Sequence, residues 1–245
     1  MPADGMRLHV LQQGLIEARD AVFLDEQGEP ELVNVDWPVR CYLIEHPLGW
    51  LLWDAGLPEN PQATGSPAQG GMPKHIKAPL LPWLADEFGL TPADIPYAGF
   101  SHLHGDHAGN ANHFAASTVL LAAREHAYAF APSLRGPYRP KDYAALRDSR
   151  TILVEDRHDV FGDGSVVIVA APGHTPGHQV LVLTMPDQQP QILVGDAVYA
   201  PEDLIHRRVP EWNSDQAESF RSIERLVRMA DELGARLVIH HDPNG

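Results

Sequence analysis

Four side chains that can bind a metal ion lie within six residues near the middle of the chain: His102, His104, Asp106 and His107. They follow an apolar segment, residues 95–100, that reads as a short buried strand. Zinc accepts imidazole nitrogen and carboxylate oxygen as donors. Burying several imidazoles without a partner is costly. The motif therefore predicts a metal site.

Other residues with the same chemistry follow predicted strands elsewhere in the chain. They are Asp54, Asp196, the pair His174 and His178, and the pair His240 and His241. Prolines and glycines in residues 172–178 exclude a regular helix, so one histidine of the first pair can be a ligand while the other packs. Asp54 is either a cap or turn former, or a carboxylate that orients a metal-bound histidine.

With one histidine taken from each pair and Asp54 left aside, the set contains five imidazoles and two carboxylates. That is too many donors for one tetrahedral ion. Two ions about 3.5 to 4 Å apart would share them, with one carboxylate and one hydroxide bridging. A metal-bound water of this kind has a pKa of roughly 7 and is a nucleophile at neutral pH. Hydrolysis is therefore the predicted reaction class. Redox chemistry is disfavoured because zinc is not redox-active.

Strands and helices that must position these residues alternate along the chain. Strands are predicted at residues 6–12, 39–45, 50–53, 95–100, 118–122, 151–154, 166–170, 179–184, 191–194 and 236–239. Helices are predicted at 82–88, closed by Gly89, at 123–130, and from a cap at Ser214 to about Leu233. The strands deliver metal-capable residues at one end, which indicates two packed sheets with helices outside. No repeat or linker interrupts residues 1–245, so one domain is expected.

The composition is that of a globular protein, with 44% hydrophobic and 21% charged residues. A net charge of −15 argues against nucleic acid as a partner, since phosphate binding needs a positive surface. Cys41 is the single cysteine and is expected to be a core residue rather than a nucleophile. The N-terminus lacks the features of a signal peptide, and no apolar run approaches the ~20 residues of a membrane span. A cytoplasmic protein without membrane contact is expected.

These motifs resemble those of the metallo-β-lactamase superfamily, and within it most strongly the N-acyl-homoserine lactonases. The resemblance rests on residues 41–45 (CYLIE), 101–104 (SHLH), 106–109 (DHAG), 172–179 (PGHTPGHQ) and Asp196-Ala197-x-Tyr199, together with the C-terminal His-Asp. It extends over most of the chain. The resemblance implies a hydrolase of the α/β (α+β) class with an αββα sandwich and two zinc ions, other divalent metals being possible.

The resemblance also assigns a role to each ligand. His102, His104 and His174 would hold one ion, Asp106, His107 and His241 the other, and Asp196 would bridge them. Spacing alone leaves His240 and His241 equivalent, but the family pattern Gly-His-Asp matches His241-Asp242. His178 then becomes a supporting or packing residue. Because all seven expected ligands are present, a metal-binding module without turnover is disfavoured.

Tyr199 directs the interpretation toward lactones. In the resembling enzymes a tyrosine at this place points its phenol at the substrate carbonyl as an oxyanion donor. The alternative role is an aromatic ring packed at a strand end. The implied mechanism is attack of the metal-bridging hydroxide on the lactone carbonyl, with Asp106 moving the proton. A small-molecule lactone is the expected substrate, and quorum quenching the expected activity.

Other substrates of this fold form the alternatives: a thioester of the glyoxalase II type, a phosphotriester or a different lactone. Gly105 stands where many lactonases carry a larger residue, which could widen that side of the site. The segment 58–82 is expected to be a lid or binding loop, and a homodimer is possible because its apolar members could line a pocket or a subunit contact: Met72, Ile76, Leu80, Leu81 and Trp83. Further candidate pocket residues are Tyr138, Arg139 and Tyr143. The acyl-chain preference stays open.

Overall fold

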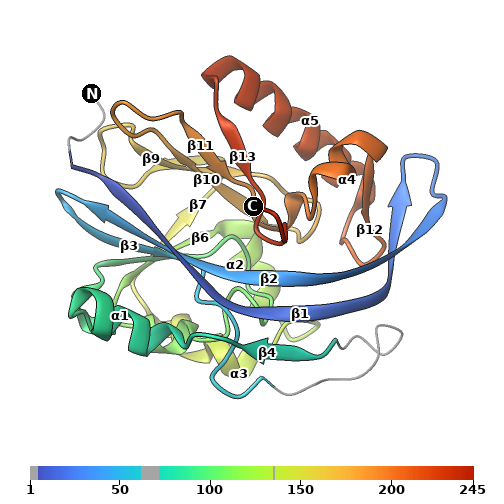
Figure 1. The fold of residues 1–245 in the computed structure, drawn as a ribbon. Helices are drawn as coiled ribbons and strands as arrows, with labels where there is room; N and C mark the ends of the chain where they lie inside the picture. The colour runs from blue at the N-terminus through green and yellow to red at the C-terminus, as the bar shows by residue number, and fades with distance from the viewer. Residues whose placement is uncertain (1–4, 62–71, 135) are drawn as a thin grey trace.

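The computed structural model describes residues 5–61, 72–134 and 136–245. Two β-sheets face each other and helices cover their outer sides (Figure 1). The expected αββα sandwich and the α/β class are confirmed. None of the helices in the described ranges is long and apolar enough to cross a membrane.

The larger sheet has eight strands among the described residues. In order across the sheet these are β12 (Arg208–Pro210), β1 (Arg7–Asp25), β2 (Pro30–His46), β3 (Gly49–Trp53), β5 (Tyr97–Gly99), β6 (Thr118–Ala122) and β7 (Thr151–Val154), and β4 (Lys74–Ile76) pairs with β1. The smaller sheet has five strands, in the order β13 (Arg236–Val238), β11 (Gln191–Leu193), β10 (Gln179–Leu183), β9 (Val166–Ala170) and β8 (Arg157–Asp159). The strands predicted from 118 to 122, 151 to 154 and 166 to 170 have the observed bounds.

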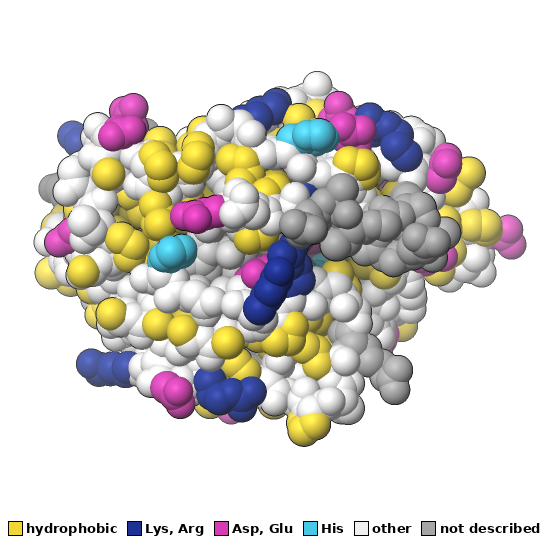
Figure 2. Space-filling view, turned by 90° about the horizontal axis from the view of Figure 1, so that it is seen from below, with side chains coloured by type: hydrophobic (Ala, Val, Ile, Leu, Met, Phe, Trp, Pro, Cys, Tyr) yellow, Lys and Arg dark blue, Asp and Glu magenta, His cyan; other side chains and the backbone are white. Residues whose placement is uncertain are grey.

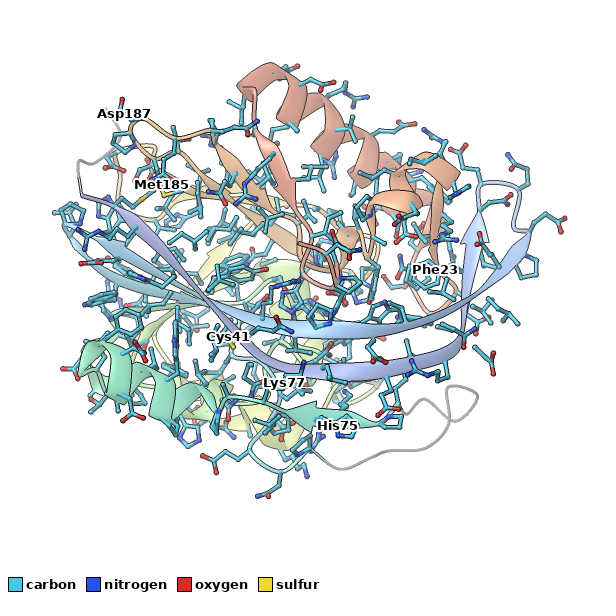
Figure 3. All side chains as sticks on the ribbon, viewed as in Figure 1. Phe23, Cys41, His75, Lys77, Met185 and Asp187 are labelled. Carbon is cyan, nitrogen blue, oxygen red and sulfur yellow. The ribbon has the colours of Figure 1, made fainter. Side chains whose placement is uncertain are left out.

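Alternation along β2 builds two cores at once, because successive side chains of a strand point to opposite faces. Tyr42 and Ile44 face the second sheet and pack with residues such as Ile168. Cys41 and Leu43 point the other way and pack against α1 (Leu80–Phe88). Cys41, labelled in Figure 3, is fully buried, and burial raises the pKa of its thiol well above the ordinary value. The prediction of a core cysteine is confirmed.

The smaller sheet is buried on both faces in the same way. Leu181 and Leu183 of β10 pack between the sheets, whereas Val180 and Val182 pack under α5 (Gln216–Leu233). The remaining short helices are α2 (Ala123–Ala129), α3 (Pro140–Tyr143) and α4 (Pro201–His206), with 3₁₀ turns at Pro92–Asp94, Ala111–Phe114, Ala144–Asp148 and Gly195–Ala197. A cap at Ser214 predicts a helix that begins at residue 215, whereas α5 begins one residue later, at Gln216. Its N-cap is Asp215, whose carboxylate accepts the Glu218 N–H, while the Ser214 hydroxyl donates to the Gly173 carbonyl.

The first two strands are much longer than the predicted strands at 6–12 and 39–45. They form one twisted hairpin with bulges after Gln12 and Ala18 (Figure 1). The part of this hairpin beyond the predicted strands, residues 13–38, is the hairpin extension. It has its own apolar cluster, which includes Ile16, Phe23 and Trp37 and also covers Tyr199. The extension therefore builds a wall beside the edge where Tyr199 lies.

The segment 58–82 is partly regular. Residues 62–71 lie outside the described residues, but Lys74–Ile76 form β4, and α1 already begins at Leu80. Leu80 is buried in the core, and Leu81 and Trp83 pack against it rather than lining a pocket. Ile76 packs against the hairpin cluster. The subunit contact stays a prediction.

Charged residues are mixed with apolar ones on the face of the molecule that carries α1 and β4. Figure 2 shows this face, where Lys and Arg side chains lie in separate small groups among acidic and apolar side chains. On this face the described residues form no continuous basic surface.

We predict that Gly109→Ala destabilises the fold strongly. A Cβ atom at Gly109 would lie 2.1 Å from the Pro58 nitrogen and 2.4 Å from the Gly56 oxygen. Because these are backbone atoms that cannot turn aside, we expect the free energy of unfolding to fall by about 3 kcal/mol or more. Urea denaturation followed by circular dichroism measures the effect. The matched control is Gly105→Ala, whose Cβ meets only the movable Arg139 side chain; equal losses in both variants would contradict the explanation.

Candidate metal centre

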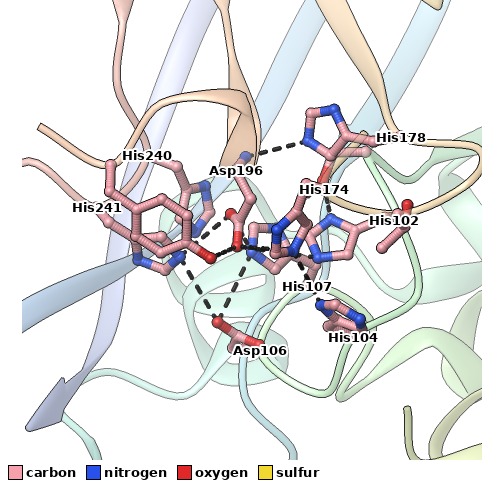
Figure 4. A network of polar contacts seen from close by, with 12 residues as sticks. His102, His104, Asp106, His107, His174, His178, Asp196, His240 and His241 are labelled. Carbon is pink, nitrogen blue, oxygen red and sulfur yellow. Dashed lines mark hydrogen bonds and ion pairs between the residues drawn. The ribbon is translucent and has the colours of Figure 1, made fainter. Parts of the chain in front are cut away.

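Asp196 stands at the centre of a cluster of buried histidines. Its Oδ1 lies 2.9 Å from His107 Nε2 and 3.2 Å from His241 Nε2. Its Oδ2 lies 3.4 Å from His174 Nε2 and 4.0 Å from His102 Nε2. Figure 4 shows the carboxylate between the two sets of rings. Each carboxylate oxygen therefore faces its own histidine group, which is the arrangement of a bridging ligand.

Around Asp196 the side chains form two groups that could each hold an ion. His102, His104 and His174 make the first group, with donor atoms within 4.8 Å of one another. Asp106 belongs with the second, since its Oδ2 lies 3.7 Å from both His107 Nε2 and His241 Nε2. All seven side chains predicted as ligands are thus brought together.

Strand ends deliver these side chains to one edge. His102 follows β5, His174 follows β9, His241 follows β13, and Asp196 lies in the 3₁₀ turn after β11. β11 and β13 are parallel, so their carboxyl ends meet. The hydrogen bond from the Gln179 N–H to the Ser101 carbonyl (2.9 Å) joins the two sheets beside the site. The centre is therefore built across the seam between the sheets.

Several donor atoms at the centre have no hydrogen-bond partner. His102 Nε2 is buried without a hydrogen-bond partner among the described residues, and His107 Nε2 and Asp196 Oδ1 lie 2.9 Å apart without forming a well-aligned hydrogen bond. Buried polar atoms are normally paired, so each unpaired one calls for an explanation. Imidazole nitrogens that converge on a carboxylate are the donor set that zinc accepts. The residues present therefore fit a pair of divalent cations.

The Nδ1 atoms of His107 and His174 are held by partners that aim the Nε2 atoms of these rings inward. His107 Nδ1 lies 2.9 Å from Asp54 Oδ2, and Asp54 also accepts the Ser101 N–H at 2.7 Å. His174 Nδ1 lies 2.8 Å from the Asn213 side-chain oxygen. Such partners fix the tautomer and orientation of a metal-binding histidine. Of the two roles considered for Asp54, the structure favours the orienting carboxylate, and Asn213 was not found from the sequence.

The two C-terminal histidines have different surroundings. His241 Nδ1 bonds to the Pro38 carbonyl at 2.9 Å, which leaves Nε2 for the centre. His240 Nε2 accepts the Arg40 N–H at 3.2 Å, and its ring packs against His107. The geometry therefore places His241 rather than His240 toward Asp106 and Asp196.

Arg40 is a buried side chain that sequence reasoning missed. Its guanidinium donates to the carbonyls of Ile239, His240, Asp242 and Gly245. One cation from β2 thereby holds the C-terminal segment that carries His241. A single arginine inside an apolar run was the only signal in the sequence.

His178 lies behind the centre and supports it. Its Nδ1 lies 3.2 Å from the Ala171 carbonyl, and its Nε2 accepts the Asp196 N–H at 3.1 Å. Burial lowers the pKa of His178 to about 3, with help from the neighbouring His174. Both ring nitrogens are thus used within the protein, which agrees with a supporting role.

Electrostatics differ between the two groups. Burial lowers the pKa of His102 well below its ordinary value, and repulsion from His107 and His104 adds to this. Burial also acts to lower the pKa of His107, but the carboxylates of Asp196, Asp54 and Asp106 outweigh it and raise that pKa well above the ordinary value. The first group therefore presents neutral imidazoles, and the second concentrates negative charge that a cation would balance.

Tyr199 directs its phenol to the centre. The hydroxyl donates to Asp196 Oδ2 at 2.5 Å, and the ring stacks on His241 with centroids 5.0 Å apart. Trp37 also packs against the Tyr199 ring, with centroids 4.9 Å apart. The Tyr199 ring is therefore packed, as its structural role would require, and its hydroxyl points at the centre, as the role of an oxyanion donor would require.

A cavity of about 610 Å³ opens onto this centre. Asp106, Asp196, Tyr199, His104 and His241 line one part of it, and the apolar side chains of Ile16, Val22, Trp37, Met72 and Trp212 line another. The two tryptophans were not predicted as site residues. Their separation of 175 positions in the chain (212 − 37) hides from the sequence that they form one wall.

The residues that line the cavity near residue 138 are not the ones that were predicted. Gly136 and Pro137 line the cavity, whereas Tyr138, Arg139 and Tyr143 are not among its lining residues. Tyr143 is a core residue whose hydroxyl donates to the Ala129 carbonyl, so its prediction as a pocket residue was wrong. The site is not widened at Gly105, because the Arg139 side chain fills the space a Cβ would enter, 2.8 Å away.

Two packed sheets between helices, with imidazoles and carboxylates gathered at one edge, define the class of metal-dependent hydrolases that share this fold. The sequence pattern of the Metallo-beta-lactamase superfamily matches residues 34–241. The N-acyl homoserine lactonase AttM of Azorhizobium caulinodans is 31% identical over an alignment that covers 98% of this chain and 94% of that protein. The chain belongs to the metallo-beta-lactamase superfamily.

Solved structures agree with this assignment. A mutant of AiiA from B. thuringiensis, with N-decanoyl-L-homoserine at its active site, is 26% identical with a TM-score of 0.74, covering 95% of this chain and 94% of that one. An N-acyl homoserine lactone hydrolase with N-hexanoyl-L-homoserine at its catalytic metal centre has a TM-score of 0.80 at 24% identity, covering 100% and 95%. The second likeness bears on the fold alone.

We predict that removal of bound metal destabilises the protein. Treatment with a chelator should lower the thermal unfolding midpoint, and added zinc should restore it, because a ligand that binds only the folded state at a thousand times its Kd contributes about 4 kcal/mol. Magnesium is the control, since a hard cation prefers oxygen ligands and should not replace zinc. Metal analysis accompanies the melts. An unchanged midpoint, or fewer than one metal per chain in gently purified protein, would contradict a two-metal centre.

Proposed function

We propose that the protein is a zinc-dependent hydrolase that opens the lactone ring of N-acyl-homoserine lactones, acting as one domain over residues 1–245. The observation that carries the proposal is the Tyr199 hydroxyl, which meets Asp196 at the centre where the cavity opens. A phenol donor beside a hydrolytic centre suits a substrate carbonyl, and the apolar wall suits an acyl chain. Relatives named N-acyl homoserine lactonase align with 98% of the chain, which supports the same substrate class.

Seven side chains would hold the zinc ions. His102, His104 and His174 would bind one, Asp106, His107 and His241 the other, and Asp196 both. When bound, zinc supplies Lewis acidity and lowers the pKa of a coordinated water to roughly 7.

Tyr199 would donate a hydrogen bond to the lactone carbonyl oxygen. Burial raises the pKa of its phenol well above the ordinary value, and the Asp196 carboxylate raises it further. The hydroxyl therefore stays protonated and able to donate at neutral pH. A donor placed where negative charge develops stabilises the transition state more than the ground state. To take this role the hydroxyl must exchange its bond to Asp196 for one to the substrate.

Asp106 would accept and return the proton. It lines the cavity and faces His107 and His241. Burial acts to raise the pKa of Asp106, but the Lys74 ammonium and the His107 imidazole outweigh it and hold the pKa below the ordinary value. The ionised carboxylate can take a proton from the attacking water and deliver it to the alkoxide that leaves when the ring opens.

The apolar wall would bind the acyl chain. Ile16, Val22 and Trp37 come from the hairpin, and Trp212 follows β12. The cavity of about 610 Å³ lies within the range of small-molecule sites, roughly 300 to 1,000 Å³. Burial of the chain against this wall would exclude water from the carbonyl.

We predict that the purified protein hydrolyses homoserine lactones in a pH-stat assay, with KM falling as the acyl chain lengthens. Each buried methylene contributes at most about 0.8 kcal/mol, or roughly a fourfold change in KM, until the wall is filled. A glutathione thioester and a phosphotriester serve as comparison substrates. Cleavage of the thioester or the phosphotriester without lactone turnover would replace the proposed substrate class.

A second prediction concerns Tyr199→Phe. The variant keeps the ring that packs on Trp37 and His241 and removes only the hydroxyl. We expect kcat for lactones to fall by about 100-fold, as for loss of one oxyanion donor, with zinc content unchanged. Steady-state kinetics and metal analysis are measured on the same preparation. If turnover and zinc content fall together, the hydroxyl serves the structure of Asp196 instead.

A further inference from the structure

Glu125 is a buried carboxylate that the proposed chemistry does not use. It lies in the first turn of α2 and is fully inaccessible to solvent. Its Oε1 accepts the Leu103 N–H at 3.0 Å and the Tyr138 hydroxyl at 2.8 Å. Its Oε2 accepts the Thr175 hydroxyl at 2.7 Å and the Gly177 N–H at 3.2 Å. Four donors from three separate segments therefore meet on one side chain.

Two of these segments carry the first histidine group. Leu103 lies between His102 and His104, and Thr175 directly follows His174. Glu125 thus joins the loop after β5 to the loop after β9 at the positions next to all three imidazoles. The approach is close, since a Cβ atom at Gly177 would lie 2.0 Å from the Glu125 nitrogen.

The third segment belongs to the cavity wall. The Tyr138 ring lies edge-on to His104 with centroids 4.6 Å apart, and the two residues form an antiparallel backbone bridge. Gly136 and Pro137, just before Tyr138, line the cavity. Through Tyr138, Glu125 is therefore connected both to the candidate metal ligand His104 and to the cavity wall that a substrate would touch.

No lysine or arginine forms an ion pair with Glu125 within the described residues. A buried carboxylate without a cationic partner is costly and persists only where hydrogen bonds compensate it. Here those hydrogen bonds come from Tyr138 and from the loops after β5 and β9. The buried carboxylate therefore needs these loops in place, and the loops in turn are held by the carboxylate.

We propose that Glu125 is a positioning residue that fixes the three imidazoles of His102, His104 and His174 relative to one another for zinc binding. This inference rests on the proposed function only in that zinc binds at this group. Residues that orient metal ligands typically change metal affinity by about 10- to 100-fold when they are replaced. Glu125 would act through the two loops, without touching metal or substrate.

The test compares zinc release from Glu125→Gln with release from the unaltered protein, using excess chromogenic chelator. Glutamine keeps the size of the side chain, but its amide nitrogen cannot accept. At least one backbone N–H, that of Leu103 or that of Gly177, therefore loses its acceptor. We expect zinc to leave one of the two sites about 10- to 100-fold faster. The visible absorption spectrum of the cobalt-substituted protein should change for the same site, because the ligand geometry is altered.

Ser117→Ala is the matched control. Its hydroxyl donates to the Ile95 carbonyl at 2.6 Å and is buried ahead of β6, so the variant also loses one buried hydrogen bond. We expect it to lower stability without changing zinc release. Thr175→Val is the second variant, which removes one donor and leaves Glu125 in place if Glu125→Gln does not fold. Its zinc release should also be faster than that of the control.

The inference is overturned if folded Glu125→Gln and Thr175→Val release zinc at the unaltered rate with an unchanged cobalt spectrum. It is equally overturned if Ser117→Ala accelerates release as much, or if the unaltered protein binds no zinc. Lactone turnover is measured separately. A protein that binds zinc and responds to Glu125→Gln but opens no lactone supports the positioning role while refuting the proposed substrate class.

Discussion

The constraint on which the site depends is the burial of many imidazoles around one carboxylate. Asp196 is the only side chain whose two oxygens face both histidine groups within the described ranges. Five histidines could not be buried around it without compensation, because burial removes their hydrogen bonds to water. His102 Nε2, which is buried and has no hydrogen-bond partner among the described residues, indicates that protein groups alone do not provide that compensation. A pair of cations would, and this is why the donors fit metal ions.

Much of the surrounding structure can be understood as holding those donors in place. Asp54, Asn213 and the Pro38 carbonyl fix the outer nitrogens of His107, His174 and His241. Arg40 holds the C-terminal segment by its carbonyls, and His178 holds the Asp196 backbone. Because each partner comes from a different strand end or loop, the centre is sensitive to the packing of both sheets.

The candidate ligands could be named from the sequence because their chemistry is local. His102, His104, Asp106 and His107 are close in the chain, and His174, Asp196 and His241 each follow an apolar run that had to be a strand. Arg40, Asn213 and the two tryptophans could not be predicted in this way. Each is an ordinary residue whose role depends on a partner far away in the chain, such as His174 for Asn213. The hairpin extension was missed for a related reason, since its strands gain stability mainly from pairing with each other and from their own apolar cluster.

The sequence by itself determined the donor set, the fold class and the reaction class, because residue type limits metal chemistry and apolar periodicity limits the strands. Spacing alone left His240 and His241 equivalent, Asp54 had two candidate roles, and Gly105 was an apparent gap. Only the tertiary structure decided these points. The backbone N–H of Arg40 donates to His240 Nε2, His107 Nδ1 bonds to Asp54, and the Arg139 side chain fills the space at Gly105. The physical reason is that orientation depends on contacts between segments distant in the chain. Residues 102–107 are thereby half of a centre whose other half arrives with β9, β11 and β13.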